Sequence, residues 1–261
     1  MAVGRAGDVK ITARGRWLRS LASVIAVLAV WETVARLHLA PPLFLPAFST
    51  VAVQLGRVIA DGTLAADLTL SLFRAFSGMA LAVIIGVPVG IAMARNRFVH
   101  WVADPLVALG FPSPKIAFIP IFILWFGIES WSKILLVAFA CVFPLTIGSY
   151  SAARSLNRVL IWSAASLGAT SRQMLIYLIL PACYPRIFAT LRVALPVALI
   201  TTFTAEMVTG GGGMGATLVY SQRFFESPTV FAYILTMLIV GLVIDFATLT
   251  FQSRYLAWAE F

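Results

Sequence analysis

Charged residues are rare in the long apolar segments of this chain, and the few that occur there are its best candidates for chemistry. A charge at the centre of a bilayer costs about 2.5–3.5 kcal/mol on insertion scales, so each such residue needs a partner or water. Arg74 and Glu206 lie toward the outer ends of their segments, and we expect them to pair and steady an outer gate. Arg192 and Asp245, toward the inner side, should pair likewise. For both pairs a static role in the helix bundle stays open beside gating.

Lys115 is a third candidate, because it follows Pro112 and Pro114 inside an apolar segment. These prolines should break the helix, since proline lacks the N–H that continues the ladder. Interrupted helices in transporters tend to line the solute path. Lys115 could therefore attract an anionic solute, or its charge could reach water at the membrane interface; both interpretations stay open.

The chemistry of an enzyme has little support. His38 and His100 are expected at opposite membrane faces, and the sequence shows no nucleophile motif and no acid-rich cytoplasmic cluster. Cys141 and Cys183 form neither a disulfide framework nor a metal site, so both should stay reduced. An integral-membrane enzyme is thus a weaker alternative than a transporter.

The segment TGGGGMG, residues 209–215, has no following Lys and Ser/Thr, so it is not a phosphate-binding loop. Glycine clusters mark turns. A flexible re-entrant turn is the favoured interpretation, with a gating role as the alternative.

The amino-acid composition indicates the class of protein in which these residues lie. Hydrophobic residues make up 61% of the 261 residues, charged residues 11%, and mean hydropathy is +0.98. Soluble domains are about one quarter charged, so this is an integral membrane protein. The net charge of +9 comes from cations scattered between apolar runs. Nucleic-acid binding would need a clustered basic face on the protein, so this class of function is excluded.

About twenty apolar residues cross the hydrocarbon core as a helix. The sequence therefore predicts an all-α membrane protein with six spans, residues 20–38, 69–93, 102–127, 132–150, 188–208 and 231–252.

The Lys and Arg residues set the direction of these spans, because cytoplasmic loops carry an excess of them. If the N-terminus is inside, the outer segments hold only Arg57, Lys133 and Arg223, with Arg36 at the rim. All other Lys and Arg between the spans then fall in cytoplasmic segments. Both termini are therefore expected in the cytoplasm.

These spans divide the chain into four parts. They are an N-terminal cytoplasmic segment, 1–19; a first span with an outer linker, 20–64; a five-helix core, 65–252, with a cytoplasmic loop, 151–187; and a C-terminal tail, 253–261. In the outer linker Val51, Leu55, Val58 and Ile59 share one helical face, which predicts a helix lying on the outer surface.

The cytoplasmic loop holds an apolar stretch, Met174–Leu180, that is too short to span. Gly168 should end one helix, since glycine enters the left-handed region without penalty. Thr170 with Gln173 fits a capping box that starts a second helix, which Pro181 should end. Pro185 can then sit in the first turn of the next span.

Small residues at one-turn spacing give the first of these helices a nearly bare face, formed by Ala164, Ala165 and Gly168. Such a face lets another protein approach closely. Ordinary close packing within the chain is the alternative.

SAASLGATSRQMLIYLILPACYPRI, residues 163–187, resembles the cytoplasmic signature loop of ABC importer permeases. Ala164, Gly168, Leu180 and Pro181 match, whereas Trp162 replaces the motif Glu and Ser163 its first Ala. Further stretches resemble the subfamily that serves nitrate, sulfonate, taurine, bicarbonate and thiamine-precursor importers, over roughly 65–258. They are residues 71–94, 112–134, 143–157, 205–215 and 241–246.

The resemblance implies a type I ABC importer permease bundle with a cytoplasmic coupling helix, in a bacterial inner membrane. Two copies, as a homodimer, would form the path for a small solute, an anion such as nitrate, a sulfonate or bicarbonate, or a thiamine precursor. A periplasmic binding protein would deliver it, and two cytoplasmic ATPase subunits would bind ATP and Mg, so this chain would hold no cofactor or metal and catalyse nothing.

The resemblance also assigns residues. ATPase coupling would use Trp162, Ser163, Ala164, Ala165, Gly168, Ala169 and Pro181. The candidates for the translocation path or gate, Arg74, Lys115, Glu206 and Asp245, rest instead on the cost of charge within spans. We expect Trp162 to pack into the ATPase groove as an apolar anchor, because the acid found in relatives is absent.

An ATP-independent secondary transporter or channel is the main alternative. It would need an ion relay, and the few buried charges form no obvious chain. No internal repeat of the length found in secondary carriers is visible. Uptake that persists when the ATPase is inactive would favour this alternative.

Overall fold

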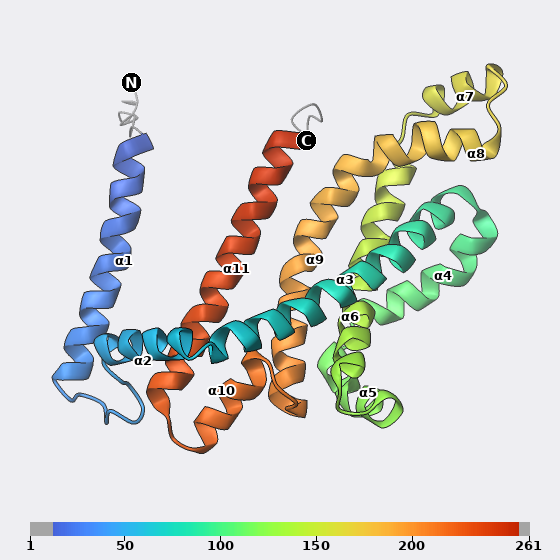
Figure 1. Cartoon of the computed structure of the whole chain (residues 1–261). Helices are drawn as coiled ribbons and strands as arrows, with labels where there is room; N and C mark the ends of the chain where they lie inside the picture. The colour runs from blue at the N-terminus through green and yellow to red at the C-terminus, as the bar shows by residue number, and fades with distance from the viewer. Residues whose placement is uncertain (1–12, 256–261) are drawn as a thin grey trace, which may run out of the picture.

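The computed structural model describes residues 13–255, and within them every regular element is a helix (Figure 1). The α-helices are α1 (Ala13–Arg36), α2 (Phe48–Ala60), α3 (Thr63–Arg95), α4 (Arg97–Gly110), α5 (Ile119–Phe126), α6 (Ser130–Arg154), α7 (Arg158–Ser166), α8 (Ser171–Met174), α9 (Leu180–Thr209), α10 (Met214–Arg223) and α11 (Ser227–Tyr255). A 3-10 turn, η1 (Lys115–Phe118), and a π-helical turn, η2 (Leu175–Ile179), complete the list.

Four helical segments of the described chain are long and apolar enough to cross a membrane: α3, α6, α11 and the continuous run Ser171–Thr209. A fifth span results if α4 and the segment Lys115–Phe126, which meet at 97°, count as one. The predicted break at Pro112 and Pro114 is therefore confirmed. The first predicted span, 20–38, corresponds to α1, which falls outside this set.

Close packing of α3 on α6 organises the bundle. Gly78, Ala82, Gly86 and Gly90 form a row at four-residue spacing on α3, and a Cβ at Gly78 or Gly90 would overlap atoms of α6. Small residues in such a row let helix backbones approach closely in membranes. Arg74 stands one turn before Gly78 in the same row, so the seam directs its side chain into the bundle.

A core of small and aliphatic side chains joins α3 and α6 to α9. Its buried members are Met79, Ala82, Val137, Cys141, Leu145, Ala194 and Ala198. Cys141 and Cys183 are both buried and free, as the sequence predicts.

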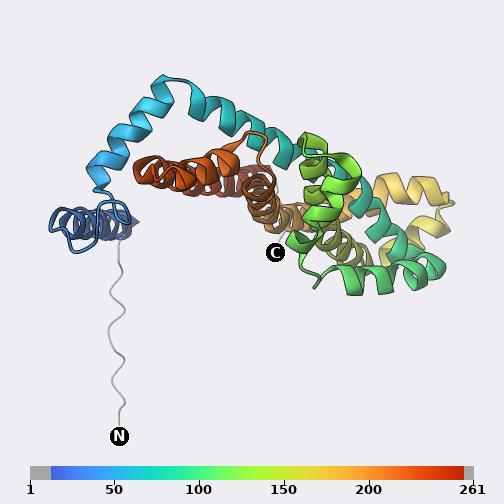
Figure 2. The same ribbon diagram turned by 90° about the horizontal axis from the view of Figure 1, so that it is seen from below.

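The predicted helix of the outer linker is α2, which leads from α1 to α3 (Figure 2). Val51 and Val58 are buried, and Val58 packs in a cluster with residues of α10 and α11. Ile59, which the sequence placed on the same face, is 57% exposed. The helix thus uses only part of its apolar face to hold the bundle.

The loop between α6 and α9 agrees with the sequence at its start. Gly168 has φ +81°, α7 ends at Ser166, and the capping box of Thr170 and Gln173 is formed.

The prediction that Pro181 ends the second helix is wrong, because the helix runs on from Ser171 to Thr209. The wide turn η2 ends at Ile179, two residues before Pro181. It accommodates a residue that lacks an N–H and whose ring crowds the preceding turn. Pro185 therefore lies inside α9 rather than in the first turn of a new span.

Two ends of the bundle can be distinguished in Figure 1. The α7 end contains α7, α8, the start of α1 and the close of α11. The α10 end contains α5, α10 and the glycine loop between α9 and α10. All segments predicted to be cytoplasmic within the described chain lie at the α7 end.

Candidate functional site: a buried polar lock and an exposed coupling loop

Arg74 and Glu206 form a buried ion pair at the α10 end. Arg74 Nη1 lies 2.8 Å from Glu206 Oε1, and the two side chains are 2% and 0% exposed. The predicted pairing of Arg74 with Glu206 is therefore confirmed.

Neutral groups satisfy the remaining hydrogen-bonding atoms of this pair. Arg74 donates to Ser130 Oγ at 3.1 Å, to the Gly212 carbonyl at 2.7 Å and to the Gly211 carbonyl at 2.9 Å. Glu206 accepts from Ser71 Oγ at 2.8 Å and from the Gly215 N–H at 3.1 Å. A buried pair with such additional bonds offsets the cost of leaving water. We call Ser71, Arg74, Ser130, Glu206 and their loop partners the polar lock.

The glycine loop, residues 210–213, owes its shape to backbone conformations that side chains rarely adopt. All four glycines have positive φ, between +67° and +97°. A Cβ on Gly213 would overlap the Glu206 carboxylate. The sequence favoured a flexible re-entrant turn here; the structure shows a turn in which Arg74 binds the carbonyls of Gly211 and Gly212.

Asp67 holds the same loop from its other side, and the sequence analysis missed it. Its carboxylate accepts from Thr217 Oγ1 at 2.6 Å, Tyr233 OH at 2.8 Å and the Gly213 N–H at 3.2 Å. The available signal was spacing, since Asp67, Ser71 and Arg74 stand at i, i+4 and i+7 on one face of α3.

Lys133 is a second missed member of the region. The sequence assigned it only to an outer segment, yet its side chain is 1% exposed and donates to the Ile128 carbonyl at 2.7 Å. The Gly211 backbone approaches it closely, because a Cβ there would lie 3.2 Å from Lys133 Nζ. The α10 end thus buries two cations, Arg74 and Lys133, with one buried carboxylate.

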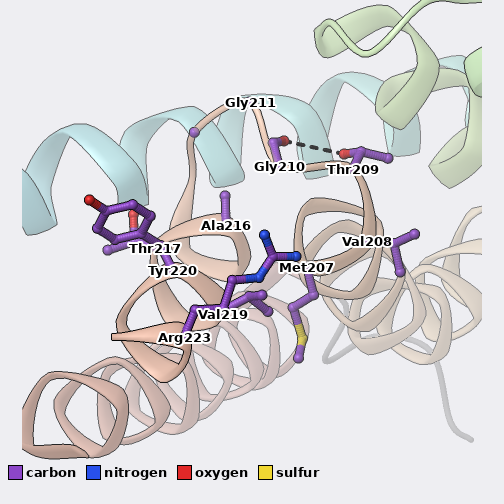
Figure 3. Close-up of a pocket in the computed structure, with 11 residues that line it drawn as sticks. Met207, Val208, Thr209, Gly210, Gly211, Ala216, Thr217, Val219, Tyr220 and Arg223 are labelled. Carbon is purple, nitrogen blue, oxygen red and sulfur yellow. Dashed lines mark hydrogen bonds between the residues drawn. The ribbon is translucent and has the colours of Figure 1, made fainter. Parts of the chain in front are cut away.

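A cavity of about 370 Å³ opens beside the glycine loop, between α9 and α10. Figure 3 shows the Arg223 side chain extending into it between Ala216 and Met207. Arg223 therefore adds a further cation to a cavity that the glycine loop of the polar lock also lines.

Arg192 and Asp245 form the second predicted pair, between α9 and α11. Arg192 Nε lies 3.1 Å from Asp245 Oδ1, so this pairing is also confirmed. The two side chains are 40% and 46% exposed, in contrast to the lock. Ionisable residues on spans face the bundle interior or a water-filled cavity, so this pair marks a surface that is open in the single chain.

Lys115 lies at the bend of the broken span. Its ammonium donates to the Gly110 carbonyl at 2.7 Å and to the Phe111 carbonyl, and lies 5.3 Å from the centre of the Phe143 ring. The structure thus shows a role as a cap for the last carbonyls of α4, in addition to the two roles that the sequence left open.

The coupling candidates gather on and after α7, except Pro181, which lies on α9. Trp162 is 63% exposed, and Ser163, Ala165 and Gly168 are exposed as well, whereas Ala164 and Ala169 are partly covered. The face formed by Ala164, Ala165 and Gly168 is therefore not fully covered by other parts of the described chain.

Comparison with known proteins assigns the family. Residues 86–256 match the family described as binding-protein-dependent transport system inner membrane component. The taurine transport system permease protein TauC of Escherichia coli is 34% identical over 244 residues, 92% of this chain and 89% of TauC. A putative aliphatic sulfonates transport permease protein, SsuC of Bacillus subtilis, is 28% identical over 93% of this chain and 88% of its own.

The fold agrees with this family. An inward-facing structure of the MetNI methionine ABC transporter superposes with a TM-score of 0.65 at 18% identity, over 73% of this chain and 94% of that one. The type I importer permease bundle predicted from the sequence is thus confirmed. The chain belongs to the binding-protein-dependent transport system inner membrane components, the permease subunits of ABC importers, which are transporter parts and not enzymes.

Proposed function

We propose that this permease subunit imports a small organic solute that bears a sulfonate group, with taurine and alkane sulfonates as the first candidates. The relatives named for taurine and aliphatic sulfonates, which align along nearly the whole chain, support this choice. Arg223, which lines the cavity beside the glycine loop, favours a solute with a negative group at the α10 end.

In this proposal two identical copies form the path. A binding protein docks at the α10 end, which faces the periplasm, and two ATPase subunits carry ATP and Mg at the α7 end in the cytoplasm. The exposed aliphatic side chains of α1, which stands apart at one edge of the molecule in Figure 2, support an interface with a second copy. They include Val24, Ile25, Val27 and Val30.

The polar lock is the outer gate of this path, and its geometry carries the proposal. Arg74 on α3 contacts Ser130 on α6, Glu206 on α9 and the glycine loop at once. Motion of any of these elements must break hydrogen bonds to the same guanidinium. The proposed gate therefore has two distinct states, one with these hydrogen bonds formed and one with them broken, as alternating access requires.

Arg192 and Asp245 line the inner part of the path. Their partial exposure on two spans fits a water-filled route better than contact with acyl chains. Trp162 and the bare face of α7 receive the ATPase, so that closure of the ATPase dimer pulls on α6 and α9 through the loop.

The test is reconstitution of the permease with its ATPase and binding protein in proteoliposomes. We expect ATP-dependent uptake of labelled taurine or an alkane sulfonate, and ATP hydrolysis that the loaded binding protein stimulates. A neutral amino acid of similar size is the control solute. Uptake that continues with an ATPase unable to hydrolyse ATP would instead support a secondary transporter.

A further inference from the structure

Two cavities at the α7 end share one residue, Arg95 in the last turn of α3. The first is an apolar groove of about 510 Å³ between α3 and the turn η2. Its walls include Val87, Ile91, Leu175 and Ile179, and at one end it meets Arg95, Asn96 and Ser171. Its size lies in the range of sites for small organic ligands.

The second cavity, of about 370 Å³, is polar and lies between α3, α6 and α7. Three arginines are among the residues that line it, Arg95, Arg154 and Arg158. Arg154 donates to the Tyr150 hydroxyl, and Arg95 to Met174 Sδ at 3.4 Å. We call it the arginine cavity.

No carboxylate of the described chain pairs with these three cations. The ion pairs formed within residues 13–255 involve other residues, and the sequence contains no Asp or Glu between Ser130 and Ala205. Three unpaired guanidinium groups around one cavity favour an anionic ligand, since Arg binds phosphate and carboxylate in a forked geometry.

We propose that the groove and the arginine cavity bind one anionic phospholipid of the cytoplasmic leaflet. One of its acyl chains lies between α3 and η2, and its phosphate lies at Arg95, the residue that the groove shares with the arginine cavity. An apolar groove that ends at cations matches the two parts of a phospholipid, and basic pockets between spans on the cytoplasmic side suit anionic headgroups. The proposal rests on the proposed function only in placing the α7 end in the cytoplasm.

The wide turn η2 gives this site a link to the coupling loop. π-helical turns are rare and frequently occur at functional sites. Here η2 forms one wall of the groove and joins α8 to α9. A lipid in the groove would therefore hold α3 against the helix that carries motion from α7 into the bundle.

Binding can be measured on the complex of the full-length permease with its ATPase subunits, without solute or ATP. The complex is exchanged into nanodiscs of phosphatidylcholine with or without phosphatidylglycerol, and native mass spectrometry then counts the retained lipids. We expect preferential retention of phosphatidylglycerol. Arg95→Gln should weaken it about fivefold, the effect of one cation at an anionic surface, and the triple change at Arg95, Arg154 and Arg158 about a hundredfold.

Two further variants separate charge from shape. Ala92→Trp should fill the groove and reduce lipid retention with every cation in place, whereas Arg95→Lys should retain most of the binding. Arg254→Gln is the matched control, since Arg254 also occupies the last turn of a span, on α11, but lines neither cavity. Melting temperatures in neutral lipid identify a variant that fails to fold.

The outcomes are distinct. Equal retention of phosphatidylcholine, undiminished binding in the triple variant, or displacement of the lipid by inorganic phosphate would each overturn the lipid site. Loss of ATPase subunits from the triple variant with lipid binding intact would assign the arginines to the ATPase instead. None of these results depends on solute uptake, so the proposed function is tested separately.

Discussion

At the α10 end Arg74, Lys133 and Glu206 are each at most 2% exposed, and Arg74 and Glu206 are paired with each other. At the α7 end Arg95, Arg154 and Arg158 are exposed and meet no carboxylate of residues 13–255. A buried charge network is stable only while every member is satisfied. At the α10 end the buried Arg74 and Glu206 thus find their partners within one chain. The α7 end leaves its three arginines without a carboxylate partner within residues 13–255, which fits the lipid and the ATPase contact that we propose there.

The largest expected effect comes from breaking the ion pair of the lock. Glu206→Gln leaves Arg74 buried without its counter-charge, and the free energy of unfolding should fall by about 4 kcal/mol. Thermal unfolding of the purified permease measures the loss, with Asp245→Asn in the half-exposed pair as the control, for which about 1 kcal/mol or less is expected. Similar losses of stability in both variants would contradict the expectation that the buried pair matters more than the half-exposed pair.

An exchange of the two residues, with Arg74→Glu and Glu206→Arg in one variant, should not restore stability, because the carbonyls of the loop then face a carboxylate.

Gly213→Ala tests whether the loop shape is part of the lock. Gly213, at φ +97° and ψ 169°, has a conformation open essentially to glycine alone, and its Cβ would overlap Glu206. We expect a loss of about 3 kcal/mol and faster uncoupled ATP hydrolysis, because the gate no longer closes. Gly210→Ala is the control, since Gly210 has φ +67° but its Cβ would meet no atom within 4 Å. Equal effects would show that only backbone strain matters.

Trp162→Ala examines the α7 end. The side chain is 63% exposed, so the stability of the permease alone should not change, whereas ATPase binding should weaken by about 2 kcal/mol, as for a tryptophan anchor at an interface. Affinity for the ATPase and ATP-coupled uptake measure the effect. Trp101→Ala on α4, where the side chain is 75% exposed, controls for loss of any exposed tryptophan. Intact assembly and coupled uptake would remove Trp162 from the ATPase contact.

Lys115→Met gives the smallest effect and concerns the bend between the two ends. Loss of the cap on α4 should lower stability by about 1 kcal/mol, with the KM for solute unchanged, because both contacts hold the ammonium at the bend. Transport assays at varied solute concentration measure this KM, and thermal unfolding measures the stability. A rise in KM for the anion without loss of stability would return Lys115 to the solute path.

The sequence predicted those features that depend on neighbours within a few residues. The break after Pro112, the positive φ at Gly168 and the capping box at Thr170 follow from local backbone chemistry, and the structure confirms them. Pro181 shows the limit of this reasoning. The local rule ends the helix there, but the π-helical turn before it lets the helix continue.

For the lock, the sequence identified the ion pair but not its surroundings. The cost of charge in a membrane was enough to propose Arg74 with Glu206. Asp67 and Lys133 were missed because each lies at the margin of a predicted span, where an exposed position is the ordinary expectation. Their contacts depend on the glycine loop, which bonds to Asp67 through the Gly213 N–H and lies close to the buried Lys133 at Gly211.

The sequence by itself determined that this is a helical membrane protein with a span broken at Pro112 and Pro114, because hydropathy and proline act locally. The similarity of residues 163–187 to the ABC permease loop was also visible in the sequence. Only the tertiary structure decided which charges are enclosed and which stay open to partners. Contacts such as that of Asp67 with Tyr233 join residues far apart in the chain. They exist because the row of glycines on α3 brings the spans close enough to enclose the lock.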